Sequence, residues 1–335
     1  MDGEQGYVDP WQEYKWISLK LKKRFLRKPN VAEASLQFAQ LARRLKQDGC
    51  RTYAGLCSLA VARCEHSVGN VAGESSGLRE SGRHFATAEQ DNGAFCFPSL
   101  QENLTSAVHC YGHAIRVHLE HSETELAGSC SLELGRVLYS LAGKPEEALQ
   151  HFVCASHLLN NCVLQRSCAL QWCVLCCVEM AHFKQALDYV TELINLCASQ
   201  LNHSQPNCAL KRVLAECRIA QLLLLLRLQL LPAQLTGEQA QVLSKFSSPA
   251  GSGRSGRALD LSWDNLGLGS DDLALWLHSF AMAIRSKDAQ AADEILSQMW
   301  PELTAVAQNL ALTLLNCCDQ MESINVTVKL DTESN

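Results

Sequence analysis

Four segments of this 335-residue chain repeat one pattern of small and large apolar residues. Each has an alanine, a larger apolar residue four positions later, and a further apolar residue three positions after that: Ala34, Phe38 and Leu41; Ala107, Tyr111 and Ala114; Ala148, Phe152 and Ala155; Ala186, Val190 and Leu193. A fainter fifth match is Ala291 with Ile295. Residues four apart share one face of a helix, where an alanine admits a neighbouring helix closely and a larger residue fills the gap beside it.

The spacing of these alanines predicts the fold class. They are 73, 41, 38 and 105 residues apart, close to two, one, one and three units of a period in the high thirties. That period is typical of helix-hairpin repeats. The sequence has no sustained alternation of apolar and polar residues, which is the pattern that would indicate strands. The chain is therefore predicted to be all-α, a degenerate tetratricopeptide-like helical-repeat solenoid.

Each hairpin should place apolar residues on its first helix nine and thirteen positions before the alanine. These positions hold Phe25 and Leu21, Tyr139 and Gly135, Cys177 and Cys173, and Met282 and His278, whereas the offset from Ala107 falls on Pro98 and the pattern fails there. The predicted repeat core is Leu21, Phe25, Ala34, Phe38, Leu41, Tyr139, Ala148, Phe152, Ala155, Cys173, Cys177, Ala186 and Val190. Pro29 with Asn30, and Gly143 before Pro145, are expected at hairpin turns.

Gly- and Ser-rich stretches suggest where the array is interrupted. We expect a flexible N-terminus over 1–14, a helical array over 15–246 containing a loop at 67–83, a linker at 247–262, C-terminal helices over 263–320 and a frayed tail at 321–335.

The charge is unevenly distributed along a chain whose net charge is −6. Residues 15–28 hold seven basic and no acidic side chains, and residues 258–335 hold twelve acidic and three basic ones. The basic run Lys20, Lys23, Arg24, Arg27 and Lys28 is interpreted as a solvated helix face, a contact with an acidic protein surface, or a nuclear or nucleic-acid signal. Net acidity and the lack of an aromatic platform argue against a nucleic-acid partner.

The apolar run Leu222 to Leu226 covers every side of a helix, which indicates either a bundle interior or a partner contact. Charged residues at 216, 218 and 227 exclude an integral membrane segment here. We name Leu222, Leu223, Leu226 and Trp300, together with the basic run, as candidate partner contacts.

The chemical motifs are weak. Cys173, Cys176 and Cys177 lie near His182 without a second Cys-x2-Cys pair, His109 and His113 lack the glutamate of a zinc protease helix, and Gly251 to Gly256 matches a dinucleotide pattern inside a linker. We expect no catalytic residues, no metal, no cofactor and no enzymatic activity. The acidic N-terminal sequence and seventeen cysteines favour a reducing, cytoplasmic setting.

Several segments resemble one known family. "LKLKKRFLRKPNVAEASLQFAQLARRL", "YVTELINLC", "LLPAQLTGEQAQVLSKFS" and "MWPELTA" are similar to the forty-kilodalton huntingtin-associated protein family, also called the factor VIII intronic transcript product family. The chain lacks that family's long proline-rich insertion, whose place is the short stretch 198–209.

This resemblance implies a partner. It suggests a heterodimer with huntingtin, in which the chain lies between the partner's helical-repeat domains and stabilises them. The alternative it implies is an effector of an early-endosomal Rab GTPase that regulates endosome motility, with the early endosome or nucleus as further locations. It implies no catalytic residues.

Overall fold

The computed structural model describes residues 9–22, 30–203, 208–247 and 271–318. Within these ranges the chain forms helices joined by turns and contains no strand, so the all-α helical-repeat prediction is confirmed. The chain divides into two compact units, residues 1–166 and residues 167–335. Helices on both sides of the predicted 247–262 linker therefore belong to the second unit.

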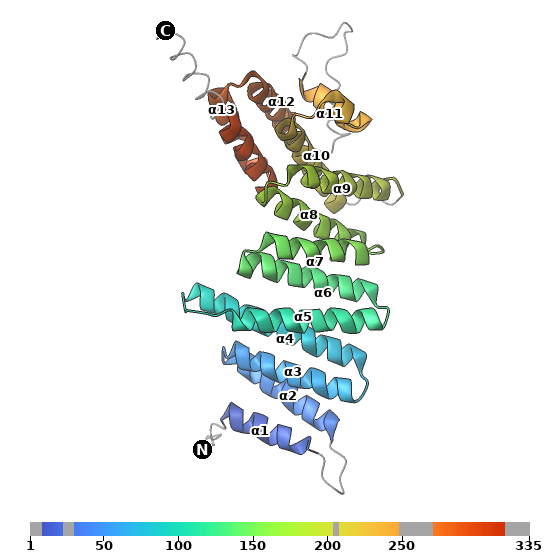
Figure 1. Ribbon diagram of the computed structural model, residues 1–335, viewed down its shortest axis with the longest axis vertical. Coiled ribbons are helices and arrows are strands. Elements are labelled where there is room, and N and C mark those ends of the chain that lie inside the picture. The colour runs from blue at the N-terminus through green and yellow to red at the C-terminus, as the bar shows by residue number, and fades with distance from the viewer. Residues whose placement is uncertain (1–8, 23–29, 204–207, 248–270, 319–335) are drawn as a thin grey trace. The chain divides into compact units, whose positions relative to one another are not determined.

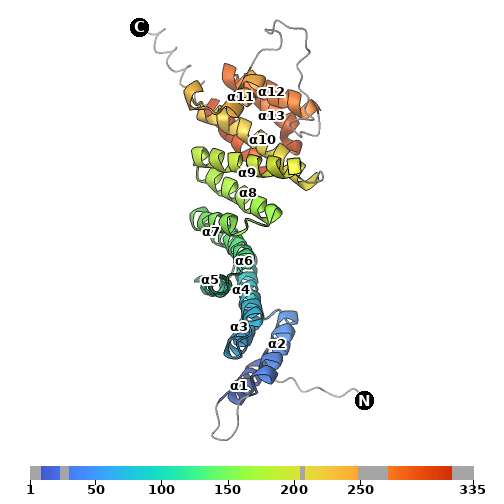
Figure 2. The same cartoon turned by 90° about the vertical axis from the view of Figure 1, so that its right-hand side faces the viewer.

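Unit 1 is a stack of helices in sequence order (Figures 1 and 2). Its elements are α1 (Pro10–Lys20), α2 (Val31–Gln47), α3 (Arg51–Ser67), α4 (Val71–Ala94), α5 (Glu102–Glu120), α6 (Thr124–Val137) with its π-helical continuation η1 (Leu138–Ala142), and α7 (Pro145–Leu158). Each helix packs against the next one in the chain. Such nearest-neighbour packing is what a helical-repeat array requires.

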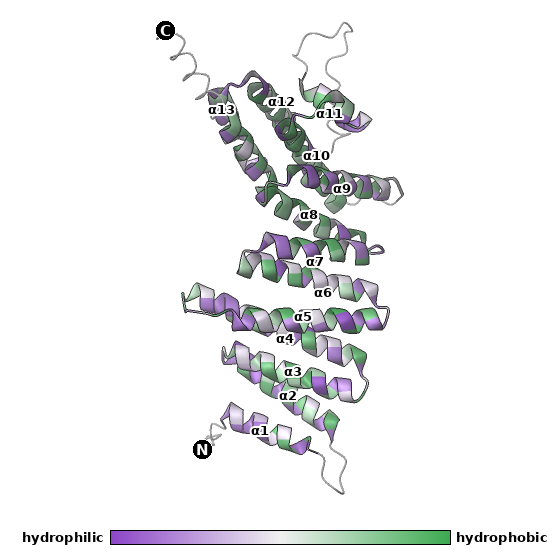
Figure 3. Cartoon of the chain, viewed as in Figure 1, coloured by the Kyte–Doolittle hydropathy of each residue, from purple (hydrophilic) through white to green (hydrophobic). Residues whose placement is uncertain are grey.

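Unit 2 begins inside α8 (Val163–Glu179). It continues with α9 (Phe183–His203), α10 (Cys208–Leu228), η2 (Pro232–Gln234), α11 (Gly237–Ser247), α12 (Asp271–Ser286), α13 (Ala289–Met299) and η4 (Trp300–Glu302), and residues 305–318 are again helical. Helices α10 and α12 are hydrophobic over much of their length (Figure 3). Helices of that composition must be enclosed by others.

The repeated apolar pattern forms the core of both units. All twelve residues of the four sets are at most 2 % exposed, and Cys173 and Cys177 of α8 are fully buried. The fifth match is wrong by one position, because Ala292 and Leu296 of α13 are the buried pair and Ala291 is only half-buried.

Five connections between consecutive helices share one backbone geometry. A residue with positive φ ends the first helix, and the N–H of the following residue donates to the carbonyl oxygen five positions back, at 2.8 to 3.0 Å. The positive-φ residues are Gly49, Gly69, Ser122, Ala181 and Lys287. This bond satisfies a carbonyl at the helix end and lets the next helix begin almost at once. The turn therefore repeats although its residue type does not.

The predicted loop at 67–83 is wrong, because residues 71–94 form the long helix α4. Its glycines permit close packing. A Cβ added at Gly77 would lie 3.0 Å from Cβ of Ala62 in α3, and one added at Gly82 would lie 2.8 Å from the Tyr111 ring in α5. The Gly- and Ser-rich composition thus reflects tight contacts on two sides of a helix.

The N-terminal boundary also needs correction. Helix α1 begins at Pro10, inside the predicted flexible segment 1–14, because Pro10 occupies the first helical position and Asp9 Oδ1 accepts a hydrogen bond from the Trp11 N–H at 3.0 Å.

Two predicted core residues are only half-buried. Leu21 lies just after α1, and Tyr139 lies in the π turn, where Leu138 takes the buried position. An extra residue in a π turn shifts the helical phase. Met282 and His278 are half-buried as well. Phe25, most of the predicted linker and the predicted tail lie outside the described residues.

Candidate functional site

The leucine run predicted as a partner contact is interior. Leu222, Leu223 and Leu226 are 1 %, 0 % and 6 % exposed within unit 2. Helix α10 packs against α9 and α11, so a run that is apolar on every side is covered by the chain itself. The prediction that these leucines form a partner surface is wrong.

The basic run is described only at its first member. Lys20 donates to Glu33 Oε1 at 3.2 Å and to Gln37 Oε1 at 3.0 Å, and its Nζ lies 3.5 Å from the centroid of the Trp16 ring. Its charge therefore joins α1 to α2 instead of standing free. Lys23, Arg24, Arg27 and Lys28 lie outside the described residues. Trp300, in η4, is 36 % exposed.

Exposed aromatic residues gather where α1 meets α3. Trp11 stacks on Tyr14 with the ring centroids 5.4 Å apart, while Tyr53 and Leu56 of α3 face the same cavity of about 650 Å³. Trp11 is 47 % and Tyr53 55 % exposed. About half of the apolar surface of these two side chains stays uncovered by the described part of unit 1.

A second exposed group lies in the connection between α4 and α5. Phe95 is 69 %, Phe97 61 % and Leu100 89 % exposed, and the two phenylalanine rings pack with their centroids 5.8 Å apart. Three large apolar side chains in six residues are unusual for a solvent-exposed connection. Such clusters mark interaction sites on soluble proteins.

The two groups lie on one edge of unit 1. The Thr52 hydroxyl at the start of α3 donates to Asn103 Oδ1 at the start of α5 at 3.1 Å. Figure 1 shows this edge running past the beginnings of α1 and α3 and the α4–α5 connection. We call these side chains the aromatic edge: Trp11, Tyr53, Leu56, Phe95, Phe97 and Leu100. Aromatic residues are enriched in protein interfaces and among the residues that dominate binding energy.

Charged groups on α4 and α6 pair within the chain. Glu133 of α6 accepts from Arg83 at 2.6 Å and lies 3.2 Å from Arg79, which raises the pKa of the Arg83 guanidinium. On the other side of α4, the buried carboxylate of Glu74 lies 2.9 Å from His66 Nδ1 and 3.8 Å from His113 Nε2. These pairs hold neighbouring helices together.

The candidate thiol site is part of the core. Burial raises the pKa of Cys176 to about 12 and that of Cys177 to about 11, so both thiols are protonated at neutral pH. A protonated thiol is a poor nucleophile and a poor metal ligand. His182 is exposed, and its backbone N–H donates to the Cys177 carbonyl oxygen at 2.8 Å as part of the α8–α9 turn.

Within the described ranges, no group of three or more His, Cys, Asp or Glu residues is arranged to hold a metal ion. No helix there combines the length and apolar character needed to cross a membrane. The Gly251 to Gly256 match lies outside these ranges.

Comparison with known proteins places the chain in a family. No family model matches it. It is 33 % identical, over an alignment 348 positions long, to the 40-kDa huntingtin-associated protein of rat (Rattus norvegicus), and the match covers 89 % of each chain. The mouse (Mus musculus) protein of the same name gives the same identity and coverage.

The chain belongs to the 40-kDa huntingtin-associated protein family. The resemblance seen in the sequence is thereby confirmed.

In this member of the 40-kDa huntingtin-associated protein family, sequence reasoning missed the aromatic edge. Its members are scattered over ninety positions, from Trp11 to Leu100, and only the turns of the array align them. One local signal was present, since Phe95, Phe97 and Leu100 flank Pro98 in a stretch without helical periodicity. Large apolar residues that no regular element can bury are candidates for a surface contact.

Proposed function

We propose that this protein is a non-catalytic, stabilising partner of huntingtin and that the aromatic edge of unit 1 is its principal docking surface. The observation that carries the proposal is the row of exposed large apolar side chains on one edge of an otherwise well-packed helical unit. The names of the rat and mouse relatives, each a huntingtin-associated protein, supply the partner.

The mechanism is burial of apolar surface between helical repeats. Each square ångström of apolar surface removed from water contributes about 25 cal/mol, and aromatic anchors concentrate that energy in a few positions. In this proposal the hairpins of unit 1, such as α6–α7 with Gly135 against Phe152, act as tetratricopeptide-like units that would lie against the partner's own helical-repeat domains.

Charge would set the orientation of the complex. The basic residues between 15 and 28 and the acidic residues between 258 and 318 would face separate partner domains. The chain has seventeen cysteines, and none of those in its described part forms a disulfide, which suits a cytoplasmic setting; the function needs no metal or cofactor.

Co-purification tests the proposal directly. The tagged full chain is expressed in cells, and huntingtin recovered with it is quantified by mass spectrometry. The triple variant Phe95→Ser, Phe97→Ser, Leu100→Ser should lower huntingtin recovery at least about tenfold, because each exposed anchor is worth roughly 1–2 kcal/mol. Folding should be retained, since surface substitutions usually change stability by less than about 0.5 kcal/mol.

A matched control replaces three exposed apolar side chains elsewhere. Leu126→Ser, Leu275→Ser and Leu312→Ser replace side chains that are 45 %, 62 % and 42 % exposed and that lie off the aromatic edge. This variant should recover huntingtin as the wild type does. Equal recovery by both triple variants would refute the docking surface.

The same experiment separates the rival mechanisms. Association should survive moderate salt because apolar burial dominates, whereas complete release at a few hundred millimolar salt would make charge the main contribution. The effector function would be favoured instead if the chain retained no huntingtin but retained an early-endosomal Rab GTPase in only one nucleotide state of that GTPase.

A further inference from the structure

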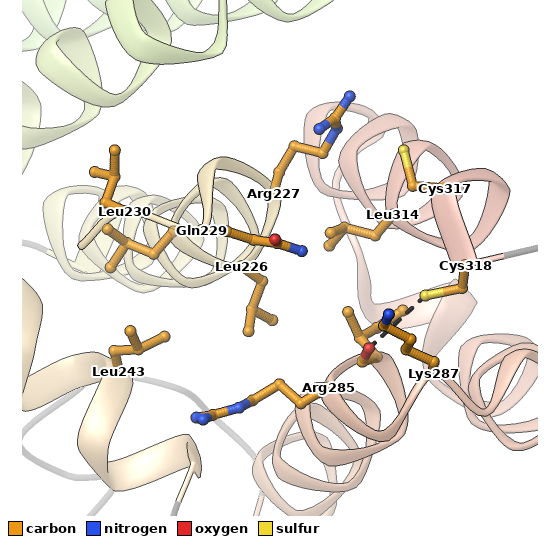
Figure 4. Close-up of a pocket in the computed structure, with 12 residues that line it drawn as sticks. Leu226, Arg227, Gln229, Leu230, Leu243, Arg285, Lys287, Leu314, Cys317 and Cys318 are labelled. Atoms are coloured by element: carbon orange, nitrogen blue, oxygen red, sulfur yellow. Dashed lines mark hydrogen bonds between the residues drawn. The ribbon is translucent and has the colours of Figure 1, made fainter. Parts of the chain in front are cut away.

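One cavity in unit 2 combines apolar walls with positive charge. It has a volume of about 390 Å³ and is lined by the ends of α10 and α12, by α11 and by the helix 305–318. Leu226, Leu230, Leu243 and Leu314 supply apolar surface. Arg227, Arg285 and Lys287 are also among the lining residues, and in Figure 4 the guanidinium of Arg227 points away from the other two side chains.

These cations have no acidic partner in the described part of the chain. Arg227 lies over the Phe183 ring at 5.0 Å, and its Nε is buried without a hydrogen-bond acceptor. Arg285 and Lys287 are exposed, and Lys287 is held at the cavity by the turn that ends α12. Unpaired cations beside apolar walls favour an occupant that is both acidic and apolar.

The surrounding sequence makes these cations exceptional. Residues 258–335 contain twelve acidic and only three basic residues, and two of the three, Arg285 and Lys287, line this cavity. Because most of the few cations of this acidic region lie at one apolar cavity, the cavity is suited to binding an anionic group.

A suitable segment begins at the cavity. Cys317 and Cys318 line it, and the Cys318 thiol lies 3.8 Å from the Ile284 carbonyl oxygen in α12. The seventeen residues that follow, 319–335, carry four acidic side chains and one basic one, with apolar residues in alternation from Ile324 to Leu330. Glu322 lies four residues beyond Cys318, a reach of at most about 14 Å.

We propose that residues 319–335 bind back into this cavity, with their acidic side chains paired to Arg227, Arg285 and Lys287 and their apolar residues against the leucines. The other acidic segment outside the described residues of unit 2, residues 258–270, carries two acidic residues and begins eleven positions after the end of α11. The segment 319–335 carries twice as many acidic residues, and it starts directly after Cys318, which lines the cavity.

Cys317 provides a built-in reporter, because its half-buried thiol lines the cavity. The test compares its alkylation rate in the purified full chain and in a chain ending at residue 318, resolved by peptide mass spectrometry. The shorter chain should react about tenfold faster at Cys317, which corresponds to about 1.4 kcal/mol of docking free energy. Cys154, exposed on α7 in unit 1, should react equally in both.

Two full-length variants guard against misfolding of the shortened chain. The first removes the acidic groups without shortening the segment: Asp319→Asn, Glu322→Gln, Asp331→Asn and Glu333→Gln. The second replaces two of the cations: Arg285→Glu and Lys287→Glu. Each variant should also expose Cys317, while combining the cation reversal with Asp319→Lys and Glu322→Lys should restore its protection.

Two results would overturn the proposal. One is a Cys317 alkylation rate that is the same with and without residues 319–335. The other is protection that is lost on Trp263→Ala but kept in the shortened chain, which would assign the cavity to residues 258–270.

Discussion

Replacing Gly135 by alanine tests how the repeat holds its helices together. Gly135 lies on α6 against Phe152 of α7, and a Cβ there would lie 2.6 Å from Cε1 and 2.8 Å from Cδ1 of Phe152. Real Cβ contacts do not fall below 3.0 Å. The Phe152 ring is 0 % exposed, so it has no free space into which it could turn.

The magnitude follows from two opposed effects. Alanine is favoured over glycine inside a helix by about 1 kcal/mol, and overpacking a core costs about 1–3 kcal/mol. Because the clash involves a rigid ring, we expect the upper part of that range and a net destabilisation of about 1–2 kcal/mol for Gly135→Ala.

Gly112→Ala is the matched control. Gly112 lies in the middle of α5, and a Cβ there would meet no atom within 4 Å. The helix-propensity gain is common to both substitutions, so the difference between them, about 2–3 kcal/mol, measures the clash alone.

Hydrogen–deuterium exchange of the α6 and α7 amides is the appropriate assay, because it reports the local opening free energy. Gly135→Ala should speed exchange in these two helices about five- to thirtyfold, and Gly112→Ala should not. In a Phe152→Leu background the Gly135→Ala substitution should become neutral or stabilising, giving a coupling energy of about 1–3 kcal/mol. Equal and additive effects of the two glycine substitutions would refute the close-packing argument.

Three further predictions concern turns, protonation and thiols. Ala181→Gly should stabilise unit 2 by about 0.5–1 kcal/mol in urea unfolding because Ala181 has φ 58°, whereas Ala240→Gly in the exposed face of α11 should destabilise it by about 1 kcal/mol. Burial lowers the pKa of His84 below 6.5, so the unfolded chain binds the proton first and stability is lost as the pH falls below about 6.5. His84→Gln should flatten this part of the profile, and an unchanged slope would contradict the assignment. Cys176, with a pKa of about 12, should resist iodoacetamide at pH 8 until the protein unfolds, while exposed Cys154 should react at once.

Helical periodicity was readable from the residues because it is local. The alanine at each repeat and the aromatic four positions on lie on one face in any helix, so the cores around Phe38, Tyr111 and Phe152 could be predicted without knowing the neighbours. Which residues are buried was harder to predict where the backbone departs from the α-helical period. At the π turn Leu138–Ala142 the core position belongs to Leu138, and Tyr139 is only half-buried.

The candidate site was harder to predict than the core. Whether Leu222 is core or surface depends on which helices cover α10, and a residue such as Phe95 becomes part of an edge only when its turn is stacked beside others. Both facts are relations between distant segments, so no window of sequence contains them.

The amino-acid pattern was therefore sufficient for the all-α class, the repeat and its family membership, since each depends on residues close together in the chain or on similarity along it. Three features depended on the packed structure. Residues 71–94 form the helix α4 and not the predicted loop, and Gly77 and Gly82 allow this helix to approach Ala62 and Tyr111 closely. Ser122 and Ala181 adopted the turn conformation usually reserved for glycine. The aromatic edge formed because stacking left its side chains uncovered while burying the leucine run of α10.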